Sequence, residues 1–174
     1  MWVFGYASLI WNPGFPVAEQ QLAKLGGYTR SFCMRSIHHR GTPTEPGLVL
    51  ALDRSEGAEC DGVAFRVADG AETNTLAYLR ERELISSAYL EEILPLTLAD
   101  DRKVEAVAYV VDRTHDQYCN LDLEEQAQII AKAVGGRGPN PEYLYNTAEH
   151  LVQLGIADAD LTRLAEKVLE LTKY

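Results

Sequence analysis

Two segments of the sequence combine residue types that could act on a carbonyl compound. The first is FGYASLIWN, residues 4–12, which directly follows an apolar stretch at the start of the chain. A strand that runs into Gly5, Tyr6, Ala7 and Ser8 must turn where small residues let the backbone approach a ligand, with amide hydrogens directed at it. Such a turn favours an anion or a carbonyl oxygen.

The second segment is YLREREL, residues 78–84. If residues 71–85 form a helix, Leu76, Leu79 and Glu83 stand at i, i+3 and i+7, so Glu83 falls on the apolar stripe that faces the core. A carboxylate on the buried side costs free energy unless something there uses it. Glu83 is therefore the candidate acid or base.

Two alternatives to a catalytic Glu83 stay open. The carboxylate could instead form an ion pair with Arg80 or Arg82, which are adjacent in sequence but not on its face of the helix. Glu81 projects about 160° away from Glu83 at ~100° per residue. It would replace Glu83 if the helix began late or were irregular.

The remaining sequence must supply the elements that position these segments. Strand-like composition is found first along the chain, a turn at residues 99–102 indicates a hairpin, and helical spacing dominates the last third. The expected strands are 1–5, 28–38, 48–53, 62–67, 89–98 and 104–111, and the expected helices are 71–85, 123–133 and 141–173, with a helical turn at 18–25 that Gly26 and Gly27 end. Strands followed by helices predict an α+β fold in which the strands form an antiparallel sheet or small barrel.

Length and composition predict one domain over residues 1–174. A chain of this length can bury a sizeable core without metals or disulfides. No window approaches a membrane span, and the start MWVFGY has no basic leader, so we expect a cytoplasmic protein. The loop at 135–141 is too short to separate domains and is interpreted as a connection between helices, although its glycines could let the chain close over a ligand.

Charge and cysteine usage limit the possible partners. A net charge of −10 and a pI near 4.8 oppose binding to nucleic acid or to anionic membranes. Cys33, Cys60 and Cys119 are odd in number and far apart, which favours buried reduced thiols over disulfides. Neither they nor the four histidines have the spacing of zinc ligands, so no metal is expected.

Five segments in order resemble the ChaC-like γ-glutamylcyclotransferases: WVFGYASLIWNPGF, HHRGTPTEPGLVLAL, CDGVAFRV, YLRERE and NPEYLYNTAEHLVQLGI. The resemblance covers nearly the whole chain and implies a small antiparallel or mixed β-barrel with flanking helices. One departure is Ala7, where the family usually has Gly. A Cβ there costs about 1 kcal/mol if φ is positive and is harmless if φ is negative. We expect a negative φ.

The resemblance also implies a reaction. The α-amine of a γ-glutamyl group attacks its own γ-carbonyl, which gives 5-oxoproline and releases the rest as an amine. For ChaC-like members the usual substrate is glutathione, which releases Cys-Gly, and no cofactor is expected. The family's YLxxRE segment maps onto Tyr78, Leu79, Arg82 and Glu83, with Glu83 as the catalytic glutamate. Two alternatives stay open. The substrate could be another γ-glutamyl compound, or the protein could be a catalytically silent binding module in which Ala7 has disrupted the loop.

The chemistry explains what such a glutamate must do. At neutral pH the α-amine is mostly protonated, so a base must take a proton before attack and an acid must later supply one to the leaving nitrogen. One partly buried carboxylate with a raised pKa can do both. Backbone amides around Tyr6, Ala7, Ser8 and Leu9 are suited to shelter the developing oxyanion. A core aromatic is the alternative for Tyr6, and a turn-stabilising residue for Ser8.

Further candidates for substrate binding lie later in the chain. An acidic protein that binds an anionic tripeptide needs local positive charge. Arg35, Ser36, Arg40 and Gly41 offer groups for a substrate carboxylate, although either arginine could simply be solvated. Tyr143 could close the pocket or pack in the core.

Overall fold

The computed structural model of the protein describes residues 1–84 and 87–173. The chain divides into two compact units, the first made of Met1–Arg30 and Ala51–Asp116 and the second of Ser31–Leu50 and Gln117–Tyr174. The single domain expected over residues 1–174 stays a prediction.

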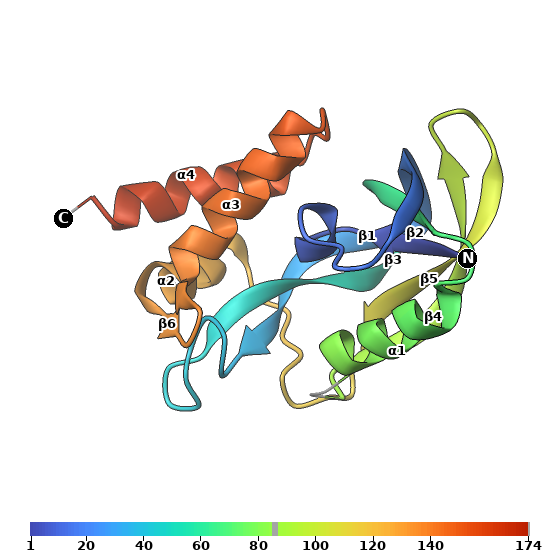
Figure 1. Ribbon diagram of the computed structural model, residues 1–174. Coiled ribbons are helices and arrows are strands. Elements are labelled where there is room, and N and C mark those ends of the chain that lie inside the picture. The colour runs from blue at the N-terminus through green and yellow to red at the C-terminus, as the bar shows by residue number, and fades with distance from the viewer. Residues whose placement is uncertain (85–86, 174) are drawn as a thin grey trace. The chain divides into compact units, whose positions relative to one another are not determined.

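A closed five-stranded barrel is the main feature of the fold (Figure 1). Its strands are β1 (Trp2–Gly5), β2 (Val17–Ser36), β3 (Gly47–Val67), β4 (Tyr89–Leu98) and β5 (Lys103–Val111), in the order β1-β3-β2-β4-β5. The β1/β3, β2/β4 and β4/β5 pairs are antiparallel, whereas β5 runs parallel to β1 and to β3. The predicted α+β class with a small mixed barrel is confirmed.

The predicted hairpin near residues 89–111 is also confirmed. β4 pairs with β5 from Tyr89 opposite Val111 to Thr97 opposite Lys103. Asp101 adopts φ 68° in the connecting turn. Aspartate is among the residues that tolerate this left-handed conformation. The residue types at 99–102 therefore predict the turn that the structure shows.

The helical turn predicted at residues 18–25 is wrong, because this segment belongs to the long strand β2. Exposure alternates residue by residue over residues 17–26, as the two-residue period of a strand requires. The strand also continues through Gly26 and Gly27, which were expected to end a helix, and Gly27 takes φ 82° within it. Pairing with neighbouring strands here outweighs weak local preferences.

β3 corrects a second prediction. Residues 48–53 and 62–67 were expected to be two strands joined by a polar connection, but Gly47–Val67 is one strand. Four of the eight residues between the two apolar runs are exposed, and one of these, Gly57, adopts φ 79°. The polar composition therefore marks the exposed part of a strand, not its end.

Helix α1 (Glu72–Glu83) confirms the helix predicted over residues 71–85, although position 85 lies outside the described residues. Leu79 is fully buried and belongs to the core cluster of the first unit, with Val3, Val67 and Tyr109 from the strands. Leu76 packs against the same cluster. The face of α1 that carries these leucines therefore turns toward the core of the barrel, as its spacing predicts.

The second unit contains three helices that pack on one another: α2 (Leu123–Lys132), α3 (Asn140–Gln153) and α4 (Ala159–Leu171). The helix predicted over 123–133 is confirmed. The one predicted over 141–173 is split in two, because the chain turns after α3 with Gly155 at φ 75°. The helical spacing of the leucines continues across this turn, so the sequence pattern does not indicate where the first helix ends.

The loop expected at residues 135–141 contains a small two-stranded sheet of β6 (Val134–Gly135) and β7 (Gly138–Pro139). Asn140 follows it and is fully buried. Its Oδ1 accepts a hydrogen bond from the Leu48 amide at 2.8 Å, and its Nδ2 donates to the Leu48 carbonyl at 2.8 Å. One side chain thus joins the start of α3 to the start of β3 within the second unit.

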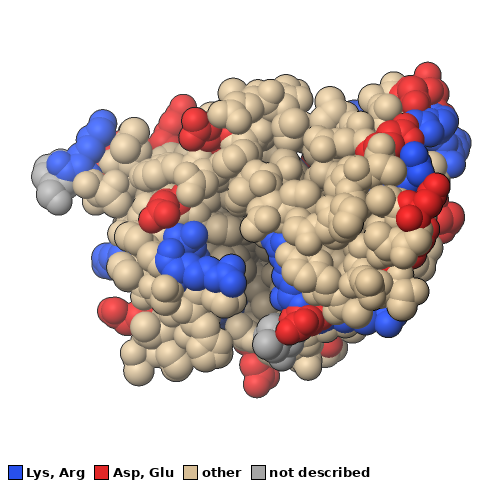
Figure 2. Space-filling model, viewed as in Figure 1, with Lys and Arg blue, Asp and Glu red and all other residues tan. Residues whose placement is uncertain are grey.

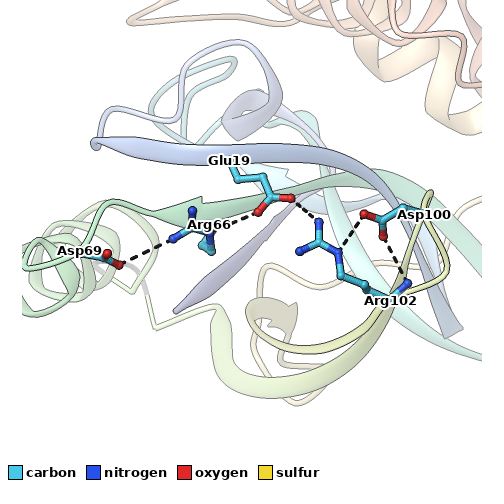
Figure 3. Close-up of polar contacts among 5 residues, drawn as sticks. All are labelled: Glu19, Arg66, Asp69, Asp100 and Arg102. Atoms are coloured by element: carbon cyan, nitrogen blue, oxygen red, sulfur yellow. Dashed lines mark hydrogen bonds and ion pairs between the residues drawn. The ribbon is translucent and has the colours of Figure 1, made fainter.

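An ionic network joins β2, β3 and the turn between β4 and β5 in the first unit (Figure 3). Glu19 of β2 pairs with Arg66 of β3 and with Arg102, which directly precedes β5. Arg102 also pairs with Asp100 at 2.8 Å, and Arg66 with Asp69 at 3.6 Å. The network spans residues that are distant in sequence, so it can stabilise the barrel.

The network predicts an acid-sensitive part of the stability. The hydrogen bond from Arg102 lowers the pKa of the Glu19 carboxyl below its ordinary value of 4.5. A carboxyl with a depressed folded pKa stabilises the protein above its unfolded pKa, and this contribution is lost as the pH falls through the folded value. Glu19→Gln should therefore reduce the loss of stability between neutral pH and pH values below 4.5, measured as urea midpoints.

Asp69→Asn is the matched control for this prediction. Asp69 lies at the edge of the network with its side chain 96% exposed, so it should change the acid dependence much less. An equal effect of both substitutions would contradict the role of Glu19.

Acidic and basic side chains are interspersed on the face drawn in Figure 2, and no large area of a single charge is seen there. Among the helices of the described residues, none is long and apolar enough to span a membrane. Cys33, Cys60 and Cys119 are all buried, as predicted. Burial also raises the pKa of the Cys119 thiol, which makes it a poor nucleophile.

Candidate active site

The N-terminal turn begins where β1 ends, at Gly5. A Cβ at this position would lie 2.9 Å from the Phe65 ring and 3.3 Å from the Leu9 Cβ. Only glycine allows this close approach, and the chain then enters the 3-10 turn η1 (Ser8–Ile10). The sharp turn predicted after the first strand is confirmed.

Ala7 is accommodated in this turn. Its φ is −143°, which is negative as expected, so a Cβ meets no left-handed penalty. The side chain is buried. The replacement of the family's usual glycine therefore gives no reason to expect a distorted loop.

Some backbone groups of the turn form hydrogen bonds with one another. The Ile10 amide donates to the Ala7 carbonyl at 2.9 Å, and the Asn12 amide donates to the Ser8 carbonyl at 3.0 Å. The amides of Ser8 and Leu9 open the 3-10 turn and therefore have no acceptor inside it. The Leu9 side chain is in the core, so this residue could reach a ligand only through its main chain.

Tyr6 is buried next to the turn, and its carbonyl accepts a hydrogen bond from Arg30 Nε at 2.6 Å. Burial is what the alternative of a core aromatic requires. The proposed contact of Tyr6 with the substrate stays a prediction.

Glu83 is the last residue of α1, and its side chain is only 17% exposed. Burial raises the pKa of the Glu83 carboxyl above its ordinary value of 4.5, and the nearby charge of Arg82 opposes this effect without cancelling it. Glu81 is exposed. The inward-facing carboxylate of the helix is therefore Glu83, as the periodicity predicts.

Arg82 departs from the expectation that it lies away from Glu83. Its Nε is 3.4 Å from Glu83 Oε1, so the ion pair considered as an alternative is present. The same guanidinium donates to the Asn12 carbonyl at 2.7 Å and to Ser8 Oγ at 2.9 Å. A long flexible side chain can reach groups that helical periodicity does not place on its face. Through Arg82 the structure brings Glu83 and the N-terminal turn together in the first unit.

Tyr109 on β5 was not identified from the sequence. It is 1% exposed, and its hydroxyl donates to Glu91 Oε1 at 2.9 Å, while Glu91 also pairs with Arg80 at 2.9 Å. Burial raises the pKa of Tyr109 far above its ordinary value, with smaller contributions from the charges of Glu91 and Glu83. It therefore stays neutral at physiological pH. Its place in the apolar run KVEAVAYVV gives no signal of a polar role.

In the second unit, four of the predicted binding residues lie together. The Arg40 guanidinium stacks over the Tyr143 ring at 5.7 Å, and the Arg40 amide donates to Ser36 Oγ at 3.0 Å. Gly41 sits so close to Gly47 that a Cβ would be 2.0 Å from the Gly47 amide nitrogen. These contacts hold both the backbone and the side chain of Arg40 in place.

Arg35 differs from this group. Its amide donates to the Gln117 carbonyl at 2.7 Å, and its carbonyl accepts from Gln117 Nε2 at 2.8 Å. These contacts fix the Arg35 backbone beside Gln117. The charge of Arg35 acts on the Cys119 thiol, whose pKa it lowers against the larger effect of burial.

Gly14, in the first unit, allows a stability test of its contact with Tyr78. It has φ 76°, and a Cβ there would lie 2.1 Å from the Tyr78 hydroxyl oxygen. Gly14→Ala should cost about 2–3 kcal/mol, since positive φ and overpacking both contribute. Gly57→Ala is the control, because Gly57 has φ 79° with nothing near its Cβ position, and it should cost about 1 kcal/mol. Equal unfolding midpoints for the two variants would contradict the Tyr78 contact.

Comparison with known proteins adds a family assignment to this geometry. A family model described as "ChaC-like protein" matches residues 1–171. The chain is 38% identical over 173 residues to the glutathione-specific γ-glutamylcyclotransferase of Escherichia coli (strain K12), with 98% of this chain and 74% of that protein covered. It is 35% identical over 175 residues to γ-glutamylcyclotransferase 2-3 of Arabidopsis thaliana, with 97% and 88% covered.

A solved structure agrees in fold. The crystal structure of a γ-glutamyl cyclotransferase specific to glutathione from yeast matches with a TM-score of 0.89 and 24% identity, over 99% of this chain and 97% of that chain. The resemblance noted in the five sequence segments is confirmed by a family model that spans nearly the whole sequence. The chain therefore belongs to the ChaC-like family.

Proposed function

We propose that this protein is a γ-glutamylcyclotransferase that converts glutathione to 5-oxoproline and Cys-Gly, with Glu83 as general acid and base. The observation that carries the proposal is the inward-facing Glu83 carboxylate held next to the N-terminal turn by Arg82. The names of the E. coli and Arabidopsis relatives support the reaction, and that of the E. coli relative supports the substrate.

The first step frees the nucleophile. The α-ammonium group of the γ-glutamyl moiety loses a proton to the Glu83 carboxylate. A carboxylate whose pKa is raised by burial is a better proton acceptor than an exposed one.

The freed amine then attacks the γ-carbonyl carbon, which forms the carbon–nitrogen bond of a five-membered ring. Nucleophile and electrophile belong to one molecule, so the enzyme has to hold the bent conformation and stabilise the oxyanion. We assign the oxyanion to main-chain amides of the turn from Tyr6 to Leu9.

Collapse of the intermediate breaks the original amide bond. Glu83 gives its proton to the departing nitrogen, then takes the second proton from the ring nitrogen and passes it to the released amine of Cys-Gly. Of the three hydrogens of the α-ammonium group, one stays in the lactam and two end on the amine of Cys-Gly, so atoms and charge balance with no other reactant.

The other predicted binding residues remain part of the proposal. Arg35 and Arg40 would supply positive charge for a substrate carboxylate. Ser36, Gly41 and Tyr143 would shape the surroundings of Arg40. A cytoplasmic location is also proposed, and the buried thiols Cys33, Cys60 and Cys119 are compatible with a reducing compartment.

A substrate panel tests the proposal. Purified protein is incubated with glutathione, with γ-glutamyl amino acids and with γ-glutamyl amines, and 5-oxoproline is quantified. Product from glutathione alone is the expected result. Product mainly from the other compounds would show that the substrate is another γ-glutamyl compound. No product from any of them would favour a binding module without catalytic activity.

A further inference from the structure

Among the residues that the structure describes, the Arg82 side chain has four polar neighbours, all in the first unit. Its Nη1 donates to the Asn12 carbonyl at 2.7 Å and to the Tyr78 hydroxyl at 3.1 Å, and its Nη2 donates to Ser8 Oγ at 2.9 Å. Its Nε lies 3.4 Å from Glu83 Oε1. The side chain is 20% exposed, so these contacts are largely shielded from water.

These contacts join parts of the chain that are distant in sequence. Asn12 and Ser8 belong to the N-terminal turn, whereas Tyr78 and Glu83 belong to α1. The proposed reaction needs the turn and the carboxylate at a fixed separation, because a misplacement of about 1 Å can cost about 100-fold in rate. Arg82 is suited to fix that separation.

A guanidinium group is the side chain that fits this task. Its planar fork directs several N–H groups at once, so it can satisfy acceptors on the turn and on the helix in one geometry. A lysine ammonium carries the same charge on a single atom. It cannot reach all of these acceptors together.

The charge of Arg82 has a second effect. Burial alone would favour the protonated form of Glu83, and a nearby positive charge favours the ionised form that can accept a proton. Geometry and charge can therefore be separated by substitution.

We propose that Arg82 is a positioning residue that holds the N-terminal turn against α1 and pairs with the Glu83 carboxylate that acts as base. This inference rests on the proposed function. It assigns to Arg82 no contact with the substrate.

Three variants test the role. Arg82→Met removes fork and charge, and should lower kcat about 100-fold while moving the acid limb of the kcat/KM profile to higher pH. Arg82→Lys keeps the charge, and should lower kcat about 10-fold with the acid limb near its wild-type position. Added guanidinium should partly restore the activity of Arg82→Ala.

Arg80→Met is the matched control. Arg80 lies on the same helix, is exposed and pairs with Glu91. This variant should retain kcat and the pH profile, and thermal unfolding of all variants separates loss of fold from loss of positioning.

Titration of the Glu83 carboxyl by carbon-13 NMR keeps the test independent of turnover. Its pKa should be higher in Arg82→Met than in the wild type. An unchanged pKa together with wild-type kcat would overturn the positioning role. A wild type that makes no 5-oxoproline from any γ-glutamyl compound would instead overturn the proposed function.

Discussion

Replacing Glu83 by glutamine is expected to lower kcat for 5-oxoproline formation about 1,000-fold. The amide has nearly the shape of the carboxyl but can neither accept the ammonium proton nor return it to the departing nitrogen. The side chain is only 17% exposed, so no bulk-water base can take its place easily. The measurement is kcat with saturating glutathione, beside a thermal unfolding curve.

Glu81→Gln is the matched control for this variant. Glu81 lies two residues earlier on the same helix and is exposed. It should retain wild-type kcat, which would also exclude Glu81 as an alternative base. Loss of activity in Glu81→Gln with retention in Glu83→Gln would reverse the assignment.

Replacing Asn140 by aspartate is expected to destabilise the protein by about 3 kcal/mol at neutral pH. The Asn140 amide is fully buried and both accepts from and donates to the Leu48 backbone. The introduced carboxylate can still accept from the Leu48 amide, but its other oxygen faces the Leu48 carbonyl with no hydrogen between them. For a chain of this size the thermal midpoint should fall by about 6–12 °C.

The pH dependence of this variant gives a second check. A buried carboxyl beside an acceptor has a raised folded pKa, so its destabilising effect should shrink as the pH falls and the protonated form donates to Leu48. Asn146→Asp on the exposed side of the same helix is the control and should cost less than about 0.5 kcal/mol. Equal midpoints for the two variants would contradict the role of Asn140.

The predictable parts of the fold are those in which local pattern and tertiary environment agree. The α1 stripe with Leu76 and Leu79 meets the core, and the turn at Asp101 closes the β4/β5 hairpin. Residues 18–25 of β2 were predicted wrongly, because their inward positions include half-buried polar residues such as Glu19 besides the buried Ala23 and Leu25. The conformation of this segment depends on partner strands that no local window contains.

In the candidate site, too, some residues could be predicted from local sequence and others could not. Helical spacing was enough to predict that Glu83 faces inward. Whether the turn could accept Ala7 depended only on the sign of its φ angle, which is negative. Arg82 could not be placed this way, since periodicity describes where a Cβ points and not how far a guanidinium extends. Tyr109 was hidden in an apolar strand, because the sequence does not reveal which neighbour its hydroxyl will meet.

The central claim is that Glu83 drives an intramolecular cyclisation, and isotopically labelled water tests it most directly. Wild-type protein and Glu83→Gln are incubated with glutathione in water enriched in heavy oxygen, and the products are analysed by mass spectrometry. The account predicts one Cys-Gly for each 5-oxoproline, no label in the 5-oxoproline from the wild type, and almost no product from the variant. Labelled glutamate as the main product, or equal turnover by Glu83→Gln, would contradict it.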